Sequence, residues 1–256
     1  MFEVQAEAYD RLAGRYGAHL AAGLCDFAGV EAGMRTLDVG AGPGALTAEL
    51  VRRVGVANVV AVEPSESFAH ACRARVPGVE VVQAGAEALP LANDAFDAVL
   101  SQLVVNFVTD APAALREMAR VTRAGGGVAA CVWDYGDEMQ VLRAFWDAAR
   151  EVSPEAAALD EAGMPFCREG ELGALFGNAG LLHVRSAQLR VRARYTGFDE
   201  LWSPFPAGVG PSGAFAAALD DERRAALRDA LRRRLGVGDA PFELTARAWA
   251  AAGTVP

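Results

Sequence analysis

The segment from Leu37 to Thr47 (Leu-Asp-Val-Gly-Ala-Gly-Pro-Gly-Ala-Leu-Thr) most constrains the fold of this chain. An apolar run, 34–39, precedes its glycines and reads as a buried strand, and a helical pattern, 46–54, follows them. Glycines at such a junction allow a tight turn and a close approach of the backbone to a ligand. In an open α/β sheet, ligands bind beyond the carboxyl ends of the strands. The segment therefore predicts a ligand-binding loop between a strand and a helix.

The same alternation of strand and helix continues through the first half of the chain. The predicted strands are 34–39, 58–62, 79–83, 96–101 and 128–133. Helices are expected over 46–54 and 66–76, and from Asp110 to about Arg123, where Gly125-Gly126-Gly127 is expected to end the last one. Strands that alternate with helices of about ten residues indicate βαβ units. The predicted fold is α/β, a doubly wound and mostly parallel Rossmann-like sheet.

After Trp133, the predicted strands and helices no longer alternate regularly. We expect helices over 139–152, 169–179 and 214–235, strands over 182–194 and 243–251, and a loop with a short helix over 198–211. One or two helices are expected over 6–27. The chain, 1–256, is expected to be a single domain with a cofactor-binding core over 28–133. Segments 134–168 and 197–240 interrupt that pattern, and are expected to form a helical lid that binds the substrate.

An acidic residue at the end of the second predicted strand is placed to bind a nucleoside. Glu63 ends the second predicted strand, 23 residues after Gly40. A carboxylate at this spacing from a glycine-rich loop can accept hydrogen bonds from both ribose hydroxyls. The glycine loop and Glu63 together predict a nucleoside-containing cofactor.

The motifs resemble those of class I S-adenosylmethionine-dependent methyltransferases that act on small molecules, of the methyltransferase type 11-like group. The acid-x-Gly-x-Gly-x-Gly pattern of that family is matched by Asp38, Gly40, Gly42 and Gly44. Three further family motifs are matched by Val62-Glu63-Pro64-Ser65, by Gly85 to Pro90 and by Phe96 to Val99. The resemblance covers about residues 6–133 and the final strand. It implies seven strands, with the last one antiparallel.

The resemblance also implies a set of residues that bind S-adenosylmethionine, with S-adenosylhomocysteine as the product. The glycine-loop backbone would lie along the methionine and ribose, while Asp38 would order the loop or reach the amino group through water. Glu63 would bind the ribose diol, and Gln102 would lie near the methionine end, mainly through its backbone. Tyr9 and Arg15 would cover the cofactor, with Arg15 on its carboxylate. The full set is Tyr9, Arg15, Asp38, Gly40, Ala41, Gly42, Gly44, Glu63, Pro64, Ser65, Gly85, Ala86, Glu87 and Gln102.

The substrate and the chemistry of transfer are less constrained by the sequence. Trp133, Trp202 and Phe205 are the candidate substrate-binding residues, and their rings favour an apolar or aromatic acceptor, although a ring of this kind taken alone is more often ordinary core. None of His19, His70 and His183 has an acidic partner at a suggestive spacing, so no catalytic base is named. Transfer by in-line displacement needs a base only when the acceptor must lose a proton. The acceptor atom and the oligomeric state stay open.

Charge and composition exclude several classes of protein. The net charge of −9 disfavours nucleic-acid binding, and no apolar run is long enough for a membrane span. The first twelve residues lack the pattern of a secretory signal, so the expected location is the cytoplasm. The four cysteines have neither Cys-x-x-Cys spacing nor a nearby His, so no metal is expected.

Two other functions are weighed against methyl transfer. Gly40, Gly42 and Ala45 could be fitted to the fingerprint of an NAD(P)-dependent oxidoreductase, but Asp38, Gly44 and the later motifs favour S-adenosylmethionine. A non-catalytic S-adenosylmethionine-binding protein would keep the same loop intact, and the sequence leaves it as an alternative.

Overall fold

The computed structural model describes residues 14–208 and 210–256, which fall into two compact units. The first, here called the sheet unit, comprises Gly17–Trp133, Pro165–Leu189 and Ala248–Pro256. The second, called the helical unit, comprises Asp134–Met164, Arg190–Arg247 and the described residues 14–16. The chain passes between the units several times, so neither is one continuous segment. Tyr9 lies outside the described residues.

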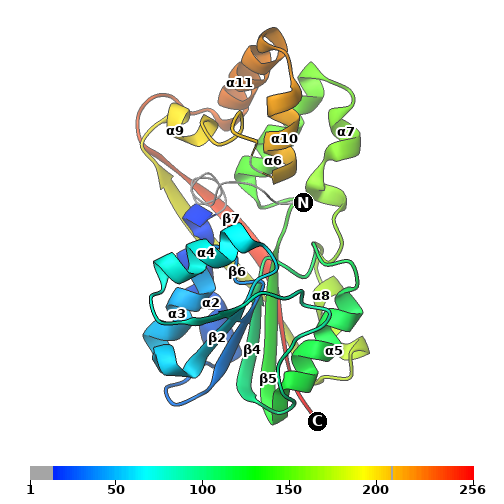
Figure 1. Ribbon diagram of the computed structural model, residues 1–256. Helices are drawn as coiled ribbons and strands as arrows, with labels where there is room; N and C mark the ends of the chain where they lie inside the picture. Colours follow the sequence, from blue (N-terminus) through cyan, green and yellow to red (C-terminus); the bar gives the residue numbers. More distant parts are fainter. Residues whose placement is uncertain (1–13, 209) are drawn as a thin grey trace. The chain divides into compact units, whose positions relative to one another are not determined.

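The described strands form one seven-stranded sheet in the order β3-β2-β1-β4-β5-β7-β6 (Figure 1). Pairs among β1 to β5 are parallel, and β7 runs antiparallel to β5. This order confirms the predicted mostly parallel α/β sheet and its antiparallel last strand. The strands are β1 (Thr36–Val39), β2 (Val59–Val62), β3 (Glu80–Val82), β4 (Phe96–Gln102), β5 (Thr122–Trp133), β6 (Leu182–Tyr195) and β7 (Phe242–Thr254).

Burial explains why the central strands are continuous apolar runs. Every residue of β1 and β2 is buried, as expected for parallel strands covered on both faces. Figure 1 shows α3 and α4 on one side of the sheet and α5 and α8 on the other. The helices that belong wholly or mainly to the sheet unit are α2 (Gly14–Ala28), α3 (Ala45–Val54), η1 (Val56–Asn58), α4 (Glu66–Arg75), α5 (Ala111–Val121) and α8 (Glu171–Asn178).

The expected glycine turn after α5 is wrong. The helix begins as predicted, since the Asp110 carboxylate accepts a hydrogen bond from Ala113 N at 2.8 Å. It ends at Val121, however, and β5 starts directly at Thr122. Thr122 pairs with Phe96 and Gly127 with Ala98, so the glycines form an irregularity inside the strand. Their lack of side chains lets the strand bulge and still keep its pairing.

The helical unit is built around two long helices and a group of buried aromatic rings. Helix α6 (Gln140–Val152) packs against α11 (Asp221–Leu235). The Phe145 ring stacks on Phe205 with centroids 4.5 Å apart, and Trp146 and Phe215 extend the group. The shorter elements are α7 (Ala156–Leu159), η2 (Glu161–Gly163), α9 (Phe198–Trp202) and α10 (Gly210–Ala218).

The helical segment expected over 214–235 consists of two helices, α10 and α11. The Asp220 carboxylate accepts a hydrogen bond from Arg223 N at 2.8 Å and so starts a new helix. The Arg224 guanidinium turns back and donates to the carbonyls that end α10, including Ala216 O at 3.0 Å. Both helix ends are thus satisfied by side chains within three or four residues of the break.

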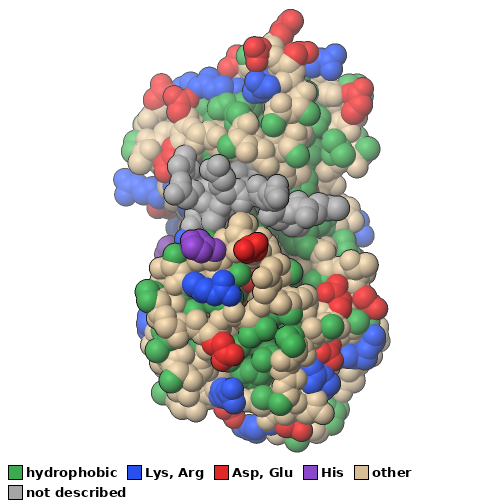
Figure 2. Space-filling model, viewed as in Figure 1, with side chains coloured by type: hydrophobic (Ala, Val, Ile, Leu, Met, Phe, Trp, Pro, Cys, Tyr) green, Lys and Arg blue, Asp and Glu red, His purple; other side chains and the backbone are tan. Residues whose placement is uncertain are grey.

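The described surface carries both signs of charge. In Figure 2, acidic and basic side chains are scattered among one another over the visible face. Among the described helices, none combines the length and apolar character that a bilayer crossing requires.

Candidate functional site

The glycine loop lies between β1 and α3 in the sheet unit, as the sequence predicts. Gly40 N and Ala41 N both donate to Val62 O, at 2.8 and 3.0 Å, which holds the loop against the end of β2. Gly40, Gly42 and Gly44 all have positive φ, at 75°, 53° and 91°. L-residues with side chains rarely adopt this conformation, so the three glycines set the path of the loop.

The three glycines differ in what surrounds them. A Cβ on Gly40 would stand 2.5 Å from Val104 Cγ2, and one on Gly44 would stand 2.9 Å from Cys72 Sγ. A Cβ on Gly42 would meet no described atom within 4 Å beyond its chain neighbours. Packing therefore requires Gly40 and Gly44, whereas Gly42 borders open space into which a ligand could come close to the backbone.

Glu63 closes this space from the end of β2. Its carboxylate accepts hydrogen bonds from Gly42 N at 2.8 Å and from Ser65 N at 2.9 Å. Burial raises the pKa of Glu63, and the two backbone hydrogen bonds oppose that rise. A carboxylate can accept about four hydrogen bonds, so two positions remain for hydroxyl donors of a ligand. The Ser65 hydroxyl caps α4, with Phe68 N at 3.4 Å.

Asp38 lies beneath the loop and is fully buried. Thr47 Oγ1 donates to its Oδ2 at 2.6 Å, which ties the first turn of α3 to β1. Burial raises the Asp38 pKa to about 7, against the effect of that hydrogen bond. Within the described chain, Oδ1 has no hydrogen-bond partner. Thr47 was not singled out in the sequence, although a hydroxyl in the first helical turn after the loop was the available signal.

The segment after β3, residues 85–87, supplies backbone groups and the Glu87 carboxylate to the candidate site. Ala86 is buried, and Glu87 Oε1 accepts a hydrogen bond from Thr109 N at 3.0 Å. Gly85 comes close to the same side chain, because a Cβ there would stand 3.2 Å from Glu87 Oε2. Nearby, Gln83 Nε2 donates to Pro64 O at 3.2 Å. These contacts hold the third motif, Gly85 to Pro90, in place within the sheet unit. Its contact with a cofactor stays a prediction.

Gln102 ends β4 beside the loop. Its Nε2 donates to Gly17 O at 3.3 Å, and its Oε1 is buried and has no hydrogen-bond partner among the described residues. Val104, two residues later, fills the space beside Gly40 and was not singled out in the sequence. No local pattern marks such a contact, because its partner lies 64 residues earlier in the chain.

Arg15 belongs to the helical unit, and its guanidinium has partners there. It donates to Glu200 Oε1 and to Arg194 O, both at 2.6 Å, and lies over the Tyr195 ring. The hydrogen bond from Thr196 N and the Arg15 guanidinium lower the Glu200 pKa to about 2. Contact of Arg15 with a cofactor carboxylate remains a prediction.

The candidate substrate-binding rings are buried within their own units. Trp133 ends β5 in the sheet unit and is 2% exposed. Trp202 and Phe205 belong to the helical unit, where their ring centroids lie 5.8 Å apart. Their part in substrate binding stays a prediction.

The described residues hold no cluster of His, Cys, Asp and Glu that could bind a metal ion. His19, His70 and His183 are all exposed. A buried acid that the sequence did not mark is Glu161, whose Oε2 accepts a hydrogen bond from Trp146 Nε1 at 2.9 Å. Its pKa is raised to about 7, chiefly by burial.

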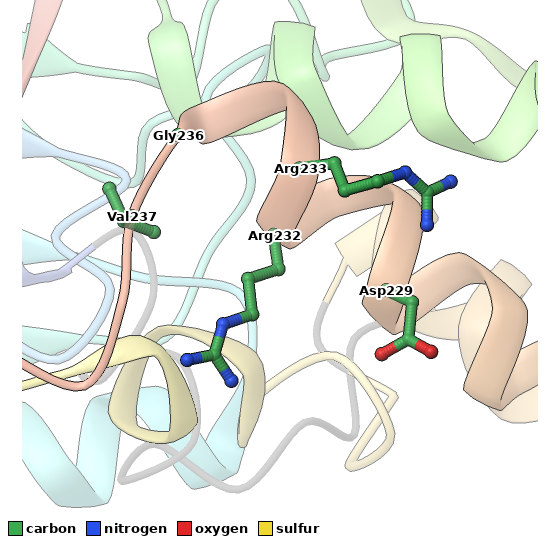
Figure 3. A pocket seen from close by; sticks show the side chains of 5 residues that line it. All are labelled: Asp229, Arg232, Arg233, Gly236 and Val237. Carbon is green, nitrogen blue, oxygen red and sulfur yellow. The ribbon is translucent and has the colours of Figure 1, made fainter.

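A shallow pocket of about 430 Å³ lies at the end of α11 in the helical unit (Figure 3). Arg232 and Arg233 line it, but Arg232 Nη2 lies 3.0 Å from Asp239 Oδ1 and Arg233 Nη2 lies 3.6 Å from Glu151 Oε2. The end of a helix also carries partial negative charge, which disfavours an anion. This pocket is therefore a poor candidate for a phosphate or carboxylate site.

The sheet order and the glycine loop define a Rossmann-like protein whose candidate ligand site lies at the carboxyl ends of its strands. The family model for a methyltransferase domain matches residues 37–130, which contain this loop, Glu63 and β4. Residues 37–130 are therefore similar to the methyltransferase domain that this family model describes.

Two curated relatives show the extent of the sequence similarity. The ubiquinone/menaquinone biosynthesis C-methyltransferase UbiE of Idiomarina loihiensis is 37% identical over 110 residues, 40% of this chain and 44% of that protein. The malonyl-[acyl-carrier protein] O-methyltransferase of Halorhodospira halophila is 38% identical over 116 residues, 44% of this chain and 39% of that protein. The match thus spans less than half the length of these relatives.

Solved structures resemble the chain over most of its length. A putative type II methyltransferase from Anaeromyxobacter dehalogenans has a TM-score of 0.65 at 22% identity, over 94% of this chain and 97% of that one. A phosphoethanolamine N-methyltransferase of Haemonchus contortus, solved with S-adenosylhomocysteine, has a TM-score of 0.58 at 13% identity, over 100% of this chain and 61% of that one. At these identities the likeness establishes the fold.

Proposed function

We propose that this chain is an S-adenosylmethionine-dependent methyltransferase for a small-molecule acceptor. The observation that carries the proposal is the Glu63 carboxylate, held by Gly42 N and Ser65 N beside the open space at Gly42. This arrangement keeps acceptor positions free for the two ribose hydroxyls of a nucleoside. Within residues 14–208 and 210–256, Asp38 Oδ1 and Gln102 Oε1 are buried without hydrogen-bond partners, which fits a ligand that also carries hydrogen-bond donors at its other end.

The cofactor supplies a methyl group already activated by a sulfonium, so the protein has only to bind, orient and keep out water. Glu63 fixes the ribose, and the Gly40–Gly44 backbone sets how closely the cofactor approaches β1. Thr47, by its hydrogen bond to Asp38, holds the loop in that path. Segments 134–168 and 197–240 form the lid over the acceptor in this proposal, and the reaction takes place in the cytoplasm.

The acceptor is apolar or aromatic in this proposal, because Trp133, Trp202 and Phe205 offer rings rather than charges. Aromatic and apolar side chains typically make up most of the lining of a small-molecule site, with a few polar groups for orientation. Replacing Trp202 with Ala should raise the KM for such an acceptor and leave cofactor affinity unchanged. A bound acceptor that touches none of the three rings would contradict this part of the proposal.

The first experiment is calorimetric titration of the whole chain with S-adenosylmethionine, S-adenosylhomocysteine and NADH. We expect the two adenosyl ligands to bind and NADH not to bind. Glu63→Gln should weaken both adenosyl ligands about 100-fold or more, since the variant loses charged hydrogen bonds worth about 1.5–3 kcal/mol each.

Asp97→Asn is the matched control for Glu63→Gln. Asp97 also accepts a backbone hydrogen bond, from Arg35 N at 2.7 Å. It lies near the start of β4, however, at the end of that strand opposite to Gln102. Its substitution should leave both adenosyl affinities unchanged. Binding of NADH alone would replace the proposal with an oxidoreductase. Adenosyl binding without methyl transfer to any of a broad panel of acceptors would favour a non-catalytic binding protein.

A further inference from the structure

The chain just after β4 is held tightly against the glycine loop. Leu103 follows Gln102 with a φ of 64°, an uncommon conformation for a residue with a side chain, and its N–H donates to Cys131 O at 2.8 Å. Ser101 Oγ donates to Val39 O at 2.9 Å, which joins the ends of β4 and β1. Local strain of this kind concentrates at functional sites. The backbone at Gln102 is therefore held in place on both sides.

Only one half of the Gln102 amide is satisfied. A carbonyl oxygen can only accept, so the 3.3 Å contact with Gly17 O identifies the amide nitrogen as the group that faces α2. The amide oxygen then points elsewhere, and in the part of the chain that the structure describes it is buried without a donor. A buried acceptor left without a partner costs about 1–3 kcal/mol, so a native site that keeps one calls for an explanation.

The order of the strands indicates which part of a ligand meets this oxygen. Glu63 ends β2, and the segment 85–87 follows β3, while Gln102 ends β4 on the other side of β1. A nucleoside with its ribose on Glu63 and its base toward 85–87 extends its remaining part across β1 toward β4. In S-adenosylmethionine that part is the amino acid, whose ammonium offers three N–H donors.

We propose that the Gln102 side chain is a positioning residue that links the cofactor to α2. Its Oε1 accepts a hydrogen bond from the α-ammonium of the cofactor, while its Nε2 holds the Gly17 carbonyl. This inference rests on the proposed function and adds a role for a side chain for which only a backbone contact was expected. Gly17 allows the arrangement, because a Cβ there would stand 3.2 Å from Ala45 Cβ at the start of α3.

The test uses two ligands that differ in one group. S-adenosylhomocysteine is compared by calorimetry with its analogue in which hydrogen replaces the α-amino group and the carboxylate is kept. The wild-type chain should prefer S-adenosylhomocysteine by about 10- to 100-fold, the range for one hydrogen bond to a charged group. Gln102→Leu should abolish most of that preference, and should change the affinity for the deaminated analogue by less than about twofold.

Gln102→Glu separates the two halves of the amide. A carboxylate still accepts from the ammonium, so this variant should keep the preference for S-adenosylhomocysteine. It has no N–H for Gly17 O, so the protection from deuterium exchange that the ligand gives to residues 17–24 should fall in this variant as in Gln102→Leu. The matched control is Gln83→Leu, which removes another amide bonded to a backbone carbonyl and should leave the preference unchanged.

The outcomes distinguish this inference from the proposed function. If the wild-type chain binds neither ligand, the proposed function fails and this inference fails with it. If it binds both, but Gln102→Leu keeps the preference or weakens both ligands equally, only the role of Gln102 is overturned. Equal wild-type affinity for the two ligands would also overturn it, because the ammonium would then have no partner.

Discussion

The buried acids of the two units have different partners. In the sheet unit, Asp38 and Glu63 accept hydrogen bonds from a hydroxyl and from backbone N–H groups, and no described arginine pairs with them. In the helical unit, Asp134 and Asp160 are bound by arginines, Arg247 among them. Acids that already have a cation stabilise a structure, whereas acids without one still have acceptor capacity for a ligand. The contrast favours the sheet unit as the place of the candidate site, although one acid of the helical unit, Glu161, does not follow it.

Glu161 is the exception in the helical unit. It is 5% exposed, and its hydrogen bond comes from the Trp146 indole, with no described arginine in salt-bridge contact. Burying a carboxylate without a cation disfavours its charged form, which is why its pKa is raised. If pairing determines what a buried acid contributes, removing the cation of a paired acid should lower stability, and neutralising an unpaired acid should raise it.

The largest effect is expected for Arg247, which binds three acids of the helical unit. Its Nε donates to Asp134 Oδ2 at 2.8 Å and its Nη1 to Glu138 Oε1 at 2.6 Å. Arg247→Leu would leave Asp134, 4% exposed, as a buried charge without its cation. We expect the free energy of unfolding, measured by urea titration, to fall by about 3–5 kcal/mol.

Arg190→Leu is the control for this loss, since it removes an exposed arginine that also pairs with Glu138, at 3.0 Å. An exposed pair is worth at most about 1 kcal/mol, so this variant should remain close to the wild type. Equal losses of unfolding free energy in the two variants would contradict this prediction. The burial of Asp134 would then add nothing to the cost of removing its arginine.

The next largest effect is a pH dependence caused by Glu161. Its pKa rises from an ordinary 4.5 to about 7 on folding, so between those pH values the folded chain binds a proton that the unfolded chain has released. Its contribution is therefore fully present below pH 4.5 and is lost as the pH rises through 7, by at most about 3 kcal/mol. Glu161→Gln removes this loss, and should gain stability over the wild type between pH 5 and pH 8.

The measurement is the unfolding free energy of both proteins at several pH values across that window. Glu243→Gln, on an exposed part of β7, is the control and should follow the wild type. A constant difference between Glu161→Gln and the wild type across the window would show that folding does not raise the pKa of Glu161. The absence of a cation would then not determine what this buried acid contributes to stability.

Much of the sheet unit could be predicted because its signals are local. A strand, three spaced glycines and Glu63 within 30 residues determine the loop, and the structure has the expected sheet around them. The contacts that complete the site are not local. Val104 lies against Gly40, and the Gln102 amide meets Gly17 across 85 residues. Such pairs depend on the folded path of the chain, which no pattern in a short window reports.

The helical unit was predicted less well, for two physical reasons. The partner of Arg15 is Glu200, 185 residues away, so its ion pair could not be inferred from spacing. The acids Asp220-Asp221-Glu222 and the glycine Gly236 did mark the two ends of α11, but no local pattern marked the bounds of α10. Helix α10 itself begins at Gly210-Pro211, a composition typical of a loop.

The smallest expected effect compares one helix cap from each unit. Asp220 starts α11 with a 2.8 Å hydrogen bond from Arg223 N, while the Ser65 hydroxyl lies 3.4 Å from Phe68 N at the start of α4. Replacing a capping side chain with Ala typically costs about 1 kcal/mol, and a long contact contributes less than a short one. Asp220→Ala should therefore lower the unfolding free energy by about 1 kcal/mol, and Ser65→Ala by about half of that. Since Ser65 N also donates to Glu63, Ser65→Ala keeps that backbone bond, and its affinity for S-adenosylhomocysteine should match the wild type. A loss of ligand affinity in Ser65→Ala without a loss of stability would instead assign the hydroxyl to the ligand.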